Sequence, residues 1–208
     1  MGIILSEKLC WRPHINHLIT KLSKSSFILS KIRHYVDLNT LKMIYYALVY
    51  PHLTYCITSW GGAPGYILDP LIILHKKIIR IITNSEFRCH TPPLFFDLKL
   101  LTIKDIYSLK LAISLHNFQN DKYTGSNNFI PLQNVHSHNT RLSNKNNYYQ
   151  HQTSTNLAKS TYSSAAIRFW RSIPENIKSS SLPVFKIKLK EILINSYSQS
   201  TSSKFSSG

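Results

Sequence analysis

Acidic residues are the first place to look for chemistry in this chain, which has 25 basic residues and only 9 acidic ones. Metal-dependent polymerases and nucleases need carboxylates that converge on two metal ions, and sequences often show them as neighbours or at short spacing. No two acidic residues here are neighbours, and five aspartates stand singly, namely Asp37, Asp69, Asp97, Asp105 and Asp121. We therefore expect no metal-dependent centre, and a chain that is not an enzyme on its own.

Cysteine and histidine form the second set of candidates. A zinc site could be imagined from Cys89 and His90 with Cys56 or His116, but closed zinc sites usually pair ligands two to four residues apart at each end. That spacing is missing, so we expect no metal and no cofactor. A Cys-His nucleophile pair stays open, although nothing in the sequence positions it. Three widely spaced cysteines favour reduced thiols in an intracellular protein, nuclear or cytoplasmic and not secreted.

Basic residues give the strongest signal, a formal net charge of +16 and a pI near 9.8. Such a charge attracts polyanions, so an RNA or DNA backbone is the first partner to consider. The chain has no apolar run of membrane length, and we expect no membrane partner. The loop Gly61–Gly65 leads to Tyr66 and lacks the Lys and Ser/Thr of a phosphate-cradling loop, so no small-molecule substrate is indicated. The candidate backbone-binding residues are Lys21, Lys24, Lys31, Lys76, Lys77 and Arg80.

Two amphipathic helices are expected to position these cations. The first covers His14–Val36 and has apolar residues at steps of three and four, with its lysines on a different face. The second runs from an N-cap at Asp69, with Pro70 at the first helical position, to about Thr83. A basic helix face is also the ordinary appearance of a solvated face, so the pattern alone leaves both interpretations open.

The segment Leu41–Gly62 lies between these helices and has no charged side chain after Lys42. It reads as a buried central helix, with Asn39 as the N-cap and a bend or break at Pro51. We expect its Tyr45, Pro51, Tyr55 and Trp60 to form a structural hub.

The remaining chain is also mostly helical in its pattern. Thr102 is expected to cap a helix to about Asn117, with Asp105 as a capping-box acid. Residues 119–156 are rich in polar side chains and read as a loop region with perhaps one or two strands near Val135–Leu142. A last helix is expected over Ser181–Asn195, and a short strand at Gly2–Leu5.

Several short blocks recur in a familiar order. The most specific one comprises Leu41, Tyr45, Pro51-His52-Leu53, Tyr55 and Ser59-Trp60-Gly61. The other blocks are Gly2-Ile3-Ile4-Leu5, Leu9, Trp11, Pro13-His14-Ile15, Leu74, Lys76-Lys77, Ile79-Arg80, His90-Thr91-Pro92-Pro93-Leu94-Phe95, Leu101, Ile103, Asp105, Asn139-Thr140-Arg141, Phe169-Trp170, Ile173-Pro174, Phe185-Lys186 and Lys190. Together they resemble the C-terminal part of the reverse transcriptases, or RNA-directed DNA polymerases, of non-LTR (LINE-type, jockey-like) retrotransposons, mobile elements. The chain departs from the pattern at His75, where glutamine is usual, at Arg171, where asparagine is usual, and at Met1, where leucine is expected.

The resemblance implies a mostly α fold: a helical thumb-like bundle with a short N-terminal strand, a polar loop region and C-terminal helices. It divides the chain into the end of a palm-like strand and turn (1–13), a helical thumb-like domain (14–118), a polar linker region (119–157), a C-terminal helical segment (158–195) and a disordered tail (196–208). The family's palm, with its metal-binding aspartate pair, would precede Met1, so no catalytic residue is carried over.

By this resemblance the chain is a non-catalytic thumb fragment that binds the backbones of template and primer through its basic helix faces. The hub would then hold the two basic helices at a set angle. The alternative is a protein-interaction or oligomerisation module without a nucleic-acid role, whose exposed aromatic side chains meet the missing palm domain or a second copy.

Overall fold

The described parts of the chain fold mostly into helices, and a computed structural model describes residues 2–7, 10–120, 129–132 and 147–202. It divides into two compact units. Unit 1 comprises Met1–Ile106 and Ile192–Gly208, and unit 2 comprises Tyr107–Glu191. The chain therefore passes between the units twice, each time inside a helix.

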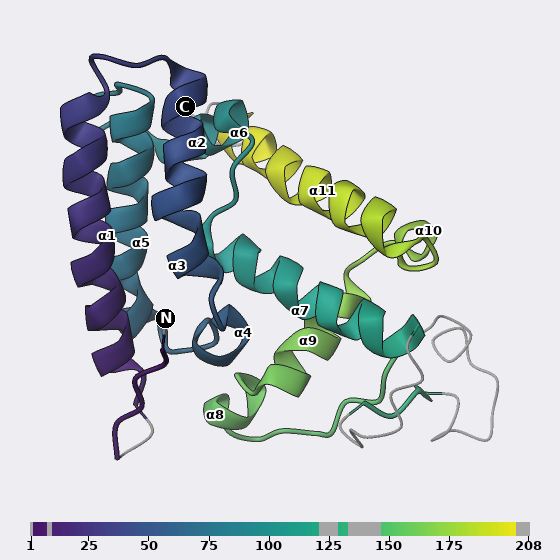
Figure 1. Ribbon diagram of the computed structural model, residues 1–208. Helices are drawn as coiled ribbons and strands as arrows, with labels where there is room; N and C mark the ends of the chain where they lie inside the picture. Colours follow the sequence, from purple (N-terminus) through teal and green to yellow (C-terminus); the bar gives the residue numbers. More distant parts are fainter. Residues whose placement is uncertain (1, 8–9, 121–128, 133–146, 203–208) are drawn as a thin grey trace. The chain divides into compact units, whose positions relative to one another are not determined.

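The mostly α fold predicted from the sequence is confirmed in the described residues. The helices in chain order are α1 (Arg12–Ile32), α2 (Leu38–Leu48), α3 (Tyr50–Thr54), α4 (Ile57–Trp60), α5 (Gly65–Ile82), α6 (Thr91–Leu98), α7 (Ile103–Asn120), α8 (Asn156–Lys159), α9 (Tyr162–Arg171), α10 (Glu175–Lys178) and α11 (Leu182–Ser202). In unit 1, α1 and α5 lie side by side and run in the same direction, while α2 runs antiparallel to them (Figure 1).

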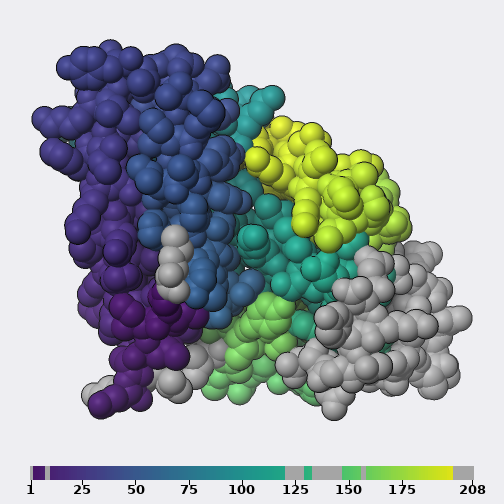
Figure 2. Space-filling view, in the orientation of Figure 1, coloured from purple at the N-terminus to yellow at the C-terminus, as the bar shows by residue number. Residues whose placement is uncertain are grey.

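Helix α1 forms where the apolar spacing predicts it. Pro13 lies in its first turn, where a missing amide N–H costs little. Its inward face buries Ile15, Leu18, Leu22 and Leu29. The α1 and α2 surfaces adjoin on the face viewed in Figure 2. A hydrogen bond also joins these helices: the Ser25 hydroxyl donates to the Leu48 carbonyl at 3.2 Å.

The central segment is not one bent helix but three pieces, α2, α3 and α4. Its N-cap is Asp37 instead of Asn39: the Asp37 carboxylate accepts hydrogen bonds from the amides of Asn39 and Thr40. The first break falls at Val49, two residues before Pro51, and the second at Cys56, which adopts a left-handed conformation with φ 48°. The sequence did not reveal this second break because no glycine marks it.

The three pieces nevertheless share one buried face. Its members recur about every four residues and are almost fully inaccessible: Leu41, Tyr45, Val49, Leu53, Ile57 and Trp60. The expectation of a buried central segment is therefore confirmed, although the helix is interrupted.

Helix α5 begins at Gly65, earlier than the predicted start at Asp69-Pro70. Pro70 lies inside the helix and leaves the Tyr66 carbonyl without an intrahelical donor. Tyr66, Asp69 and Pro70 are all exposed, so water can satisfy that carbonyl and the helix continues. The helix ends near Thr83 as predicted, because Asn84 takes a left-handed conformation with φ 51°.

The capping box at Thr102 and Asp105 forms as expected and starts α7. Tyr197 in the last turns of α11 adds to it, since its hydroxyl donates to the Asp105 carboxylate and accepts from the Thr102 amide at 3.1 Å. A disordered tail was predicted from Ser196, but α11 continues to Ser202. Burial of Tyr197, which is 8% exposed, explains the difference.

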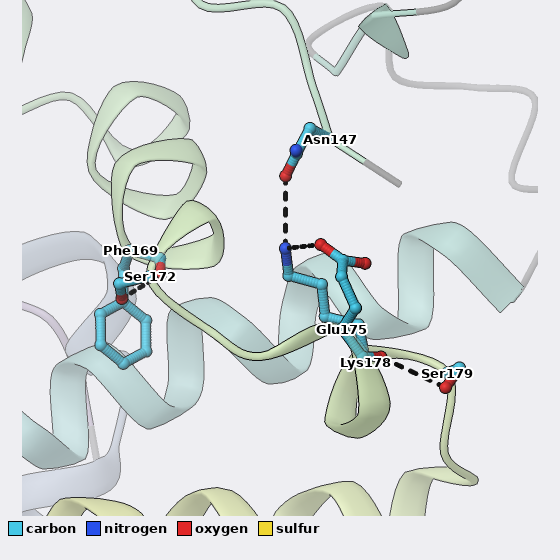
Figure 3. Close-up of polar contacts among 6 residues, drawn as sticks. All are labelled: Asn147, Phe169, Ser172, Glu175, Lys178 and Ser179. Carbon is cyan, nitrogen blue, oxygen red and sulfur yellow. Dashed lines mark hydrogen bonds and ion pairs between the residues drawn. The ribbon is translucent and has the colours of Figure 1, made fainter. Parts of the chain in front are cut away.

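Unit 2 contains a buried lysine (Figure 3). Lys178 is 3% exposed, and its ammonium lies 2.8 Å from Glu175 Oε1 and 3.2 Å from Asn147 Oδ1. The same ammonium stands 5.5 Å above the ring of Trp170. A buried charge needs such partners, because burial without them would be costly.

Two further expectations concern strands. Gly2–Leu5 forms no strand in the described residues, because a strand needs a partner and none is present there. In the polar region, Pro131 and Tyr148 form one isolated antiparallel bridge. The predicted strands near Val135–Leu142 lie outside the described residues.

Candidate nucleic-acid interface

Three of the six predicted cations lie on α1. Lys21, Lys24 and Lys31 are all exposed. Lys21 lines a cavity of about 190 Å³ whose other lining residues are Gly2, His14, His17, Leu18, His52 and Tyr55. Lys31 lies 5.5 Å above the ring of Phe27, a cation-π contact that leaves the ammonium at the surface.

The other three cations lie on α5 and behave differently from one another. Lys76 and Lys77 are exposed, and Arg80 is half-buried. Arg80 Nε donates to the Cys89 carbonyl across 3.0 Å, which ties α5 to the loop before α6. Lys76 and Arg80 line a second cavity, whereas Lys77 lies outside it. The six cations are thus distributed over two helices, and neither of these cavities gathers them all.

The hub residues differ in burial. Tyr45 and Trp60 are fully buried, Pro51 is half-buried, and Tyr55 is 38% exposed. Tyr55 was expected in the core; its backbone carbonyl, not its ring, contributes there by accepting a hydrogen bond from Trp60 Nε1 at 2.9 Å.

Two aromatic contacts connect the central segment to the basic helices. The Tyr45 hydroxyl is 2.9 Å from His75 Nε2 on α5. The ring of Trp60 lies 6.0 Å from the ring of His14 on α1. Because all four side chains are buried, these contacts fix the position of each basic helix relative to the central segment.

Electrostatics in the smaller cavity follow from its cations. Burial first, and then the neighbouring Lys21 and His17, lower the pKa of His52. Burial first, and then His17, lower the pKa of His14. Both imidazoles therefore favour the neutral form more strongly than exposed imidazoles do.

Sequence reasoning did not select Arg88 and His90, which line the larger cavity beside Lys76 and Arg80. They lie in the loop between α5 and α6, outside any helical period. His90 is the first residue of one of the blocks that carry the resemblance, and Arg88 lies two residues before it, but neither position indicated a phosphate contact.

Three further points from the sequence concern a Cys-His nucleophile pair, a metal site and a membrane span. The Cys89 thiol lies 3.5 Å from the backbone carbonyl of His90, a contact that does not involve the imidazole ring. Among the described residues, no three His, Cys, Asp or Glu side chains are grouped as metal ligands. In that same part of the chain, no helix has the length and apolar character needed to cross a bilayer.

Comparison with known proteins finds similarity over half of this chain. It is 30% identical over 109 residues to the RNA-directed DNA polymerase from mobile element jockey of Drosophila funebris. It is 28% identical over 109 residues to the probable RNA-directed DNA polymerase from transposon X-element of Drosophila melanogaster. Each alignment covers 50% of this chain and only 12% of the relative. No family model and no solved structure matches. The resemblance to non-LTR retrotransposon polymerases is thus confirmed for half of the chain.

Proposed function

We propose that this chain is a thumb-like, non-catalytic part of a retrotransposon RNA-directed DNA polymerase, and that it binds template and primer by their phosphate backbones. The observation that supports it best is the packing of α1 against α5, the two helices that carry the predicted basic faces. The similarity to polymerases of two mobile elements supports the same proposal.

The exposed lysines suit phosphate binding because their charges are uncompensated. Among the described residues, none of the six candidate cations has an ion pair with a carboxylate. Such ammonium groups attract phosphates of any sequence and release condensed counterions when they bind. Backbone binding of this kind is sequence-independent, as a thumb requires.

The buried contacts give the interface its rigidity. The Tyr45–His75 hydrogen bond holds α5, and the Trp60–His14 ring contact holds α1, both through the central segment. In this proposal the central segment sets the spacing of the two basic helices and does not itself touch nucleic acid.

The test is the salt dependence of binding to a primer–template duplex, measured by fluorescence anisotropy. If three lysines of one face contact phosphates, they should contribute about 2.7 to the slope of the log binding constant against the log salt concentration, at roughly 0.9 per contact on duplex DNA. The triple variant Lys21→Gln, Lys24→Gln, Lys31→Gln should lower the slope by up to about this amount. The double variant Lys76→Gln, Lys77→Gln should lower it by up to about 1.8. Arg80 is not substituted, because its hydrogen bond to the Cys89 carbonyl also holds the loop before α6.

A matched control is available on α11. Lys186 and Lys188 are exposed lysines in unit 2, so the variant Lys186→Gln, Lys188→Gln removes the same charge as the α5 double variant. We expect it to change the slope least. If the α11 double variant lowered the slope as much as the α5 double variant, only net charge would matter, and the assignment of these faces would be refuted.

The second candidate function is self-association through apolar side chains. Several large ones are exposed on α1, on the loop after it and on α2: Phe27, Ile28, Tyr35, Leu38, Met43 and Tyr46. Burying such a surface against a second copy would be favourable. Apolar association persists at high salt, whereas phosphate binding weakens.

Sedimentation at low and high salt separates the two candidates. A dimer that persists at high salt and that Met43→Lys disrupts would favour the interaction module. A monomer at both salt concentrations, together with salt-sensitive duplex binding, would favour the polymerase thumb.

A further inference from the structure

Unit 1 contains a cavity of about 380 Å³ beside the end of α5 and the start of α6. It is lined by Lys76, Arg80, Arg88, Cys89, His90, Thr91, Pro92, Phe95, Thr102 and Tyr197. Three of these residues are permanent cations, and none is acidic. A cavity with this charge is suited to an anion.

The loop between α5 and α6 brings the cations together. The left-handed Asn84 turns the chain, and the Ser85 amide returns to the Arg80 carbonyl across 3.0 Å. A second turn, in which the Cys89 amide donates to the Glu86 carbonyl at 3.1 Å, contains Arg88. The loop therefore folds back and places Arg88 on the cavity that Lys76 and Arg80 already line.

Arg80 is held in place for binding. Its Nε donates to the Cys89 carbonyl, which orients the guanidinium plane and leaves its terminal nitrogens as further donors. Among the described residues, neither Lys76, Arg80 nor Arg88 has a carboxylate partner. An anion in the cavity would balance the positive charges of these three side chains.

Side chains, and not the end of α6, would bind that anion. Pro92 and Pro93 occupy the first turn of α6 and carry no amide N–H, so this helix end offers few backbone donors. Guanidinium and ammonium groups together favour a phosphate, since Arg matches two phosphate oxygens at once. Pro92, which is half-buried, forms an apolar part of the wall against which a sugar can pack.

We propose that this cavity binds a phosphate group of a nucleic-acid strand, with Lys76, Arg80 and Arg88 on the phosphate oxygens and the attached sugar against Pro92. This inference rests on the proposed function and deepens it, because it assigns one phosphate to a defined pocket. The group is either a terminal monoester or an internal diester of the strand.

The experiment uses the full chain and three single variants. Lys76→Gln and Arg88→Gln remove cavity cations that have no structural hydrogen bond among the described residues. Lys77→Gln is the matched comparison, because it removes a candidate cation of the same charge at the adjacent position of α5 outside the cavity, so only the additional weakening in the cavity variants reports on the pocket. Circular dichroism checks that all three fold alike.

Two probes are used. Inorganic phosphate is titrated while the Nε–H resonances of the arginines are followed by NMR, and we expect the Arg80 and Arg88 signals to shift. Single-stranded oligonucleotides of one sequence, with a 5′-phosphate or a 5′-hydroxyl, are then compared by anisotropy. Loss of one charged hydrogen bond should raise the dissociation constant about tenfold in Lys76→Gln and in Arg88→Gln, and clearly less in Lys77→Gln.

The source of the phosphate follows from the two oligonucleotides. Tighter binding of the 5′-phosphate form, lost in the cavity variants only, assigns a terminal monoester. Equal binding of both forms, weakened in the cavity variants more than in the control, assigns an internal diester. Cavity variants that bind like Lys77→Gln, together with unshifted arginine signals, would overturn the pocket while leaving backbone binding intact. Absence of all oligonucleotide binding by the unaltered chain would instead refute the proposed function.

Discussion

Acidification should destabilise unit 1 through His75, the residue that stands where glutamine is usual in the retrotransposon pattern. His75 is 1% exposed and its Nε2 lies 2.9 Å from the Tyr45 hydroxyl. Burial lowers the pKa of His75 from 6.5 to about 3. Below pH 6.5 the unfolded chain therefore binds a proton that the folded chain excludes, so stability is lost as the pH falls and is retained above pH 6.5.

The magnitude follows from that interval. Each pH unit between the two pKa values is worth about 1.4 kcal/mol, so His75 alone should remove about 2 kcal/mol of unfolding free energy between pH 6.5 and about pH 5. The loss should level off near pH 3, where folded His75 also becomes protonated. A typical domain has only about 5–15 kcal/mol in total, so the effect is measurable.

The assay is urea denaturation at about pH 7.5 and about pH 5, comparing the unaltered chain with His75→Gln. Glutamine can keep a hydrogen bond to the Tyr45 hydroxyl but does not titrate, so this variant should lose about 2 kcal/mol less on acidification. Other histidines titrate in both proteins and cancel in the difference. An equal loss in the two proteins would refute the proposed burial of a neutral imidazole.

Three further predictions concern stability. Replacing Asp37 with alanine should lower the thermal midpoint by removing the cap of α2, whereas Asn39→Ala should leave it nearly unchanged; melting followed by circular dichroism compares them. Trp60→Phe should cost about 1–3 kcal/mol in urea denaturation, because the part-buried Tyr55 carbonyl loses its indole donor and a cavity opens; a cost near zero would contradict that contact. Lys178→Ala should destabilise the chain by about 1–3 kcal/mol, since the buried Asn147 side chain and the partly exposed Glu175 carboxylate lose their donor. Thermal melting that stays unchanged would count against a structural role for this lysine.

Periodicity predicted the helices that position the candidate site, because burial of one face leaves a period in the sequence. Lys21 and Lys76 were selected from such faces, and both are exposed on the expected helices. Helix starts were less predictable. Asp69-Pro70 matches a helix start, yet α5 begins at Gly65, since an exposed first turn tolerates the proline. Burial of the segment containing Trp60 was predicted from its composition, because it lacks charge.

Other features depend on contacts between distant parts of the chain, which no local pattern encodes. Arg88 was not selected because it lies in a loop, where no helical spacing groups it with other cations in the sequence. It lines the cavity only because that loop folds back. Cys56 breaks the central segment in a left-handed conformation that usually signals glycine. The extension of α11 depends on the hydrogen bond from Tyr197 to Asp105, which lies 92 residues earlier in the sequence. The sequence around Tyr197 is rich in serine, so composition alone did not indicate that this tyrosine is buried.

The bond between Tyr197 and the start of α7 makes unit 1 a discontinuous domain, compact in space but assembled from both ends of the sequence. Synthesis from the N-terminus supplies Met1–Ile106 first, yet the capping site at Thr102 and Asp105 meets its last partner only after all of unit 2 has been made. A shortened chain that stops at Glu191 would retain every candidate cation and still lack part of the domain that carries them. Completion of unit 1 therefore waits until helix α11 has been synthesised.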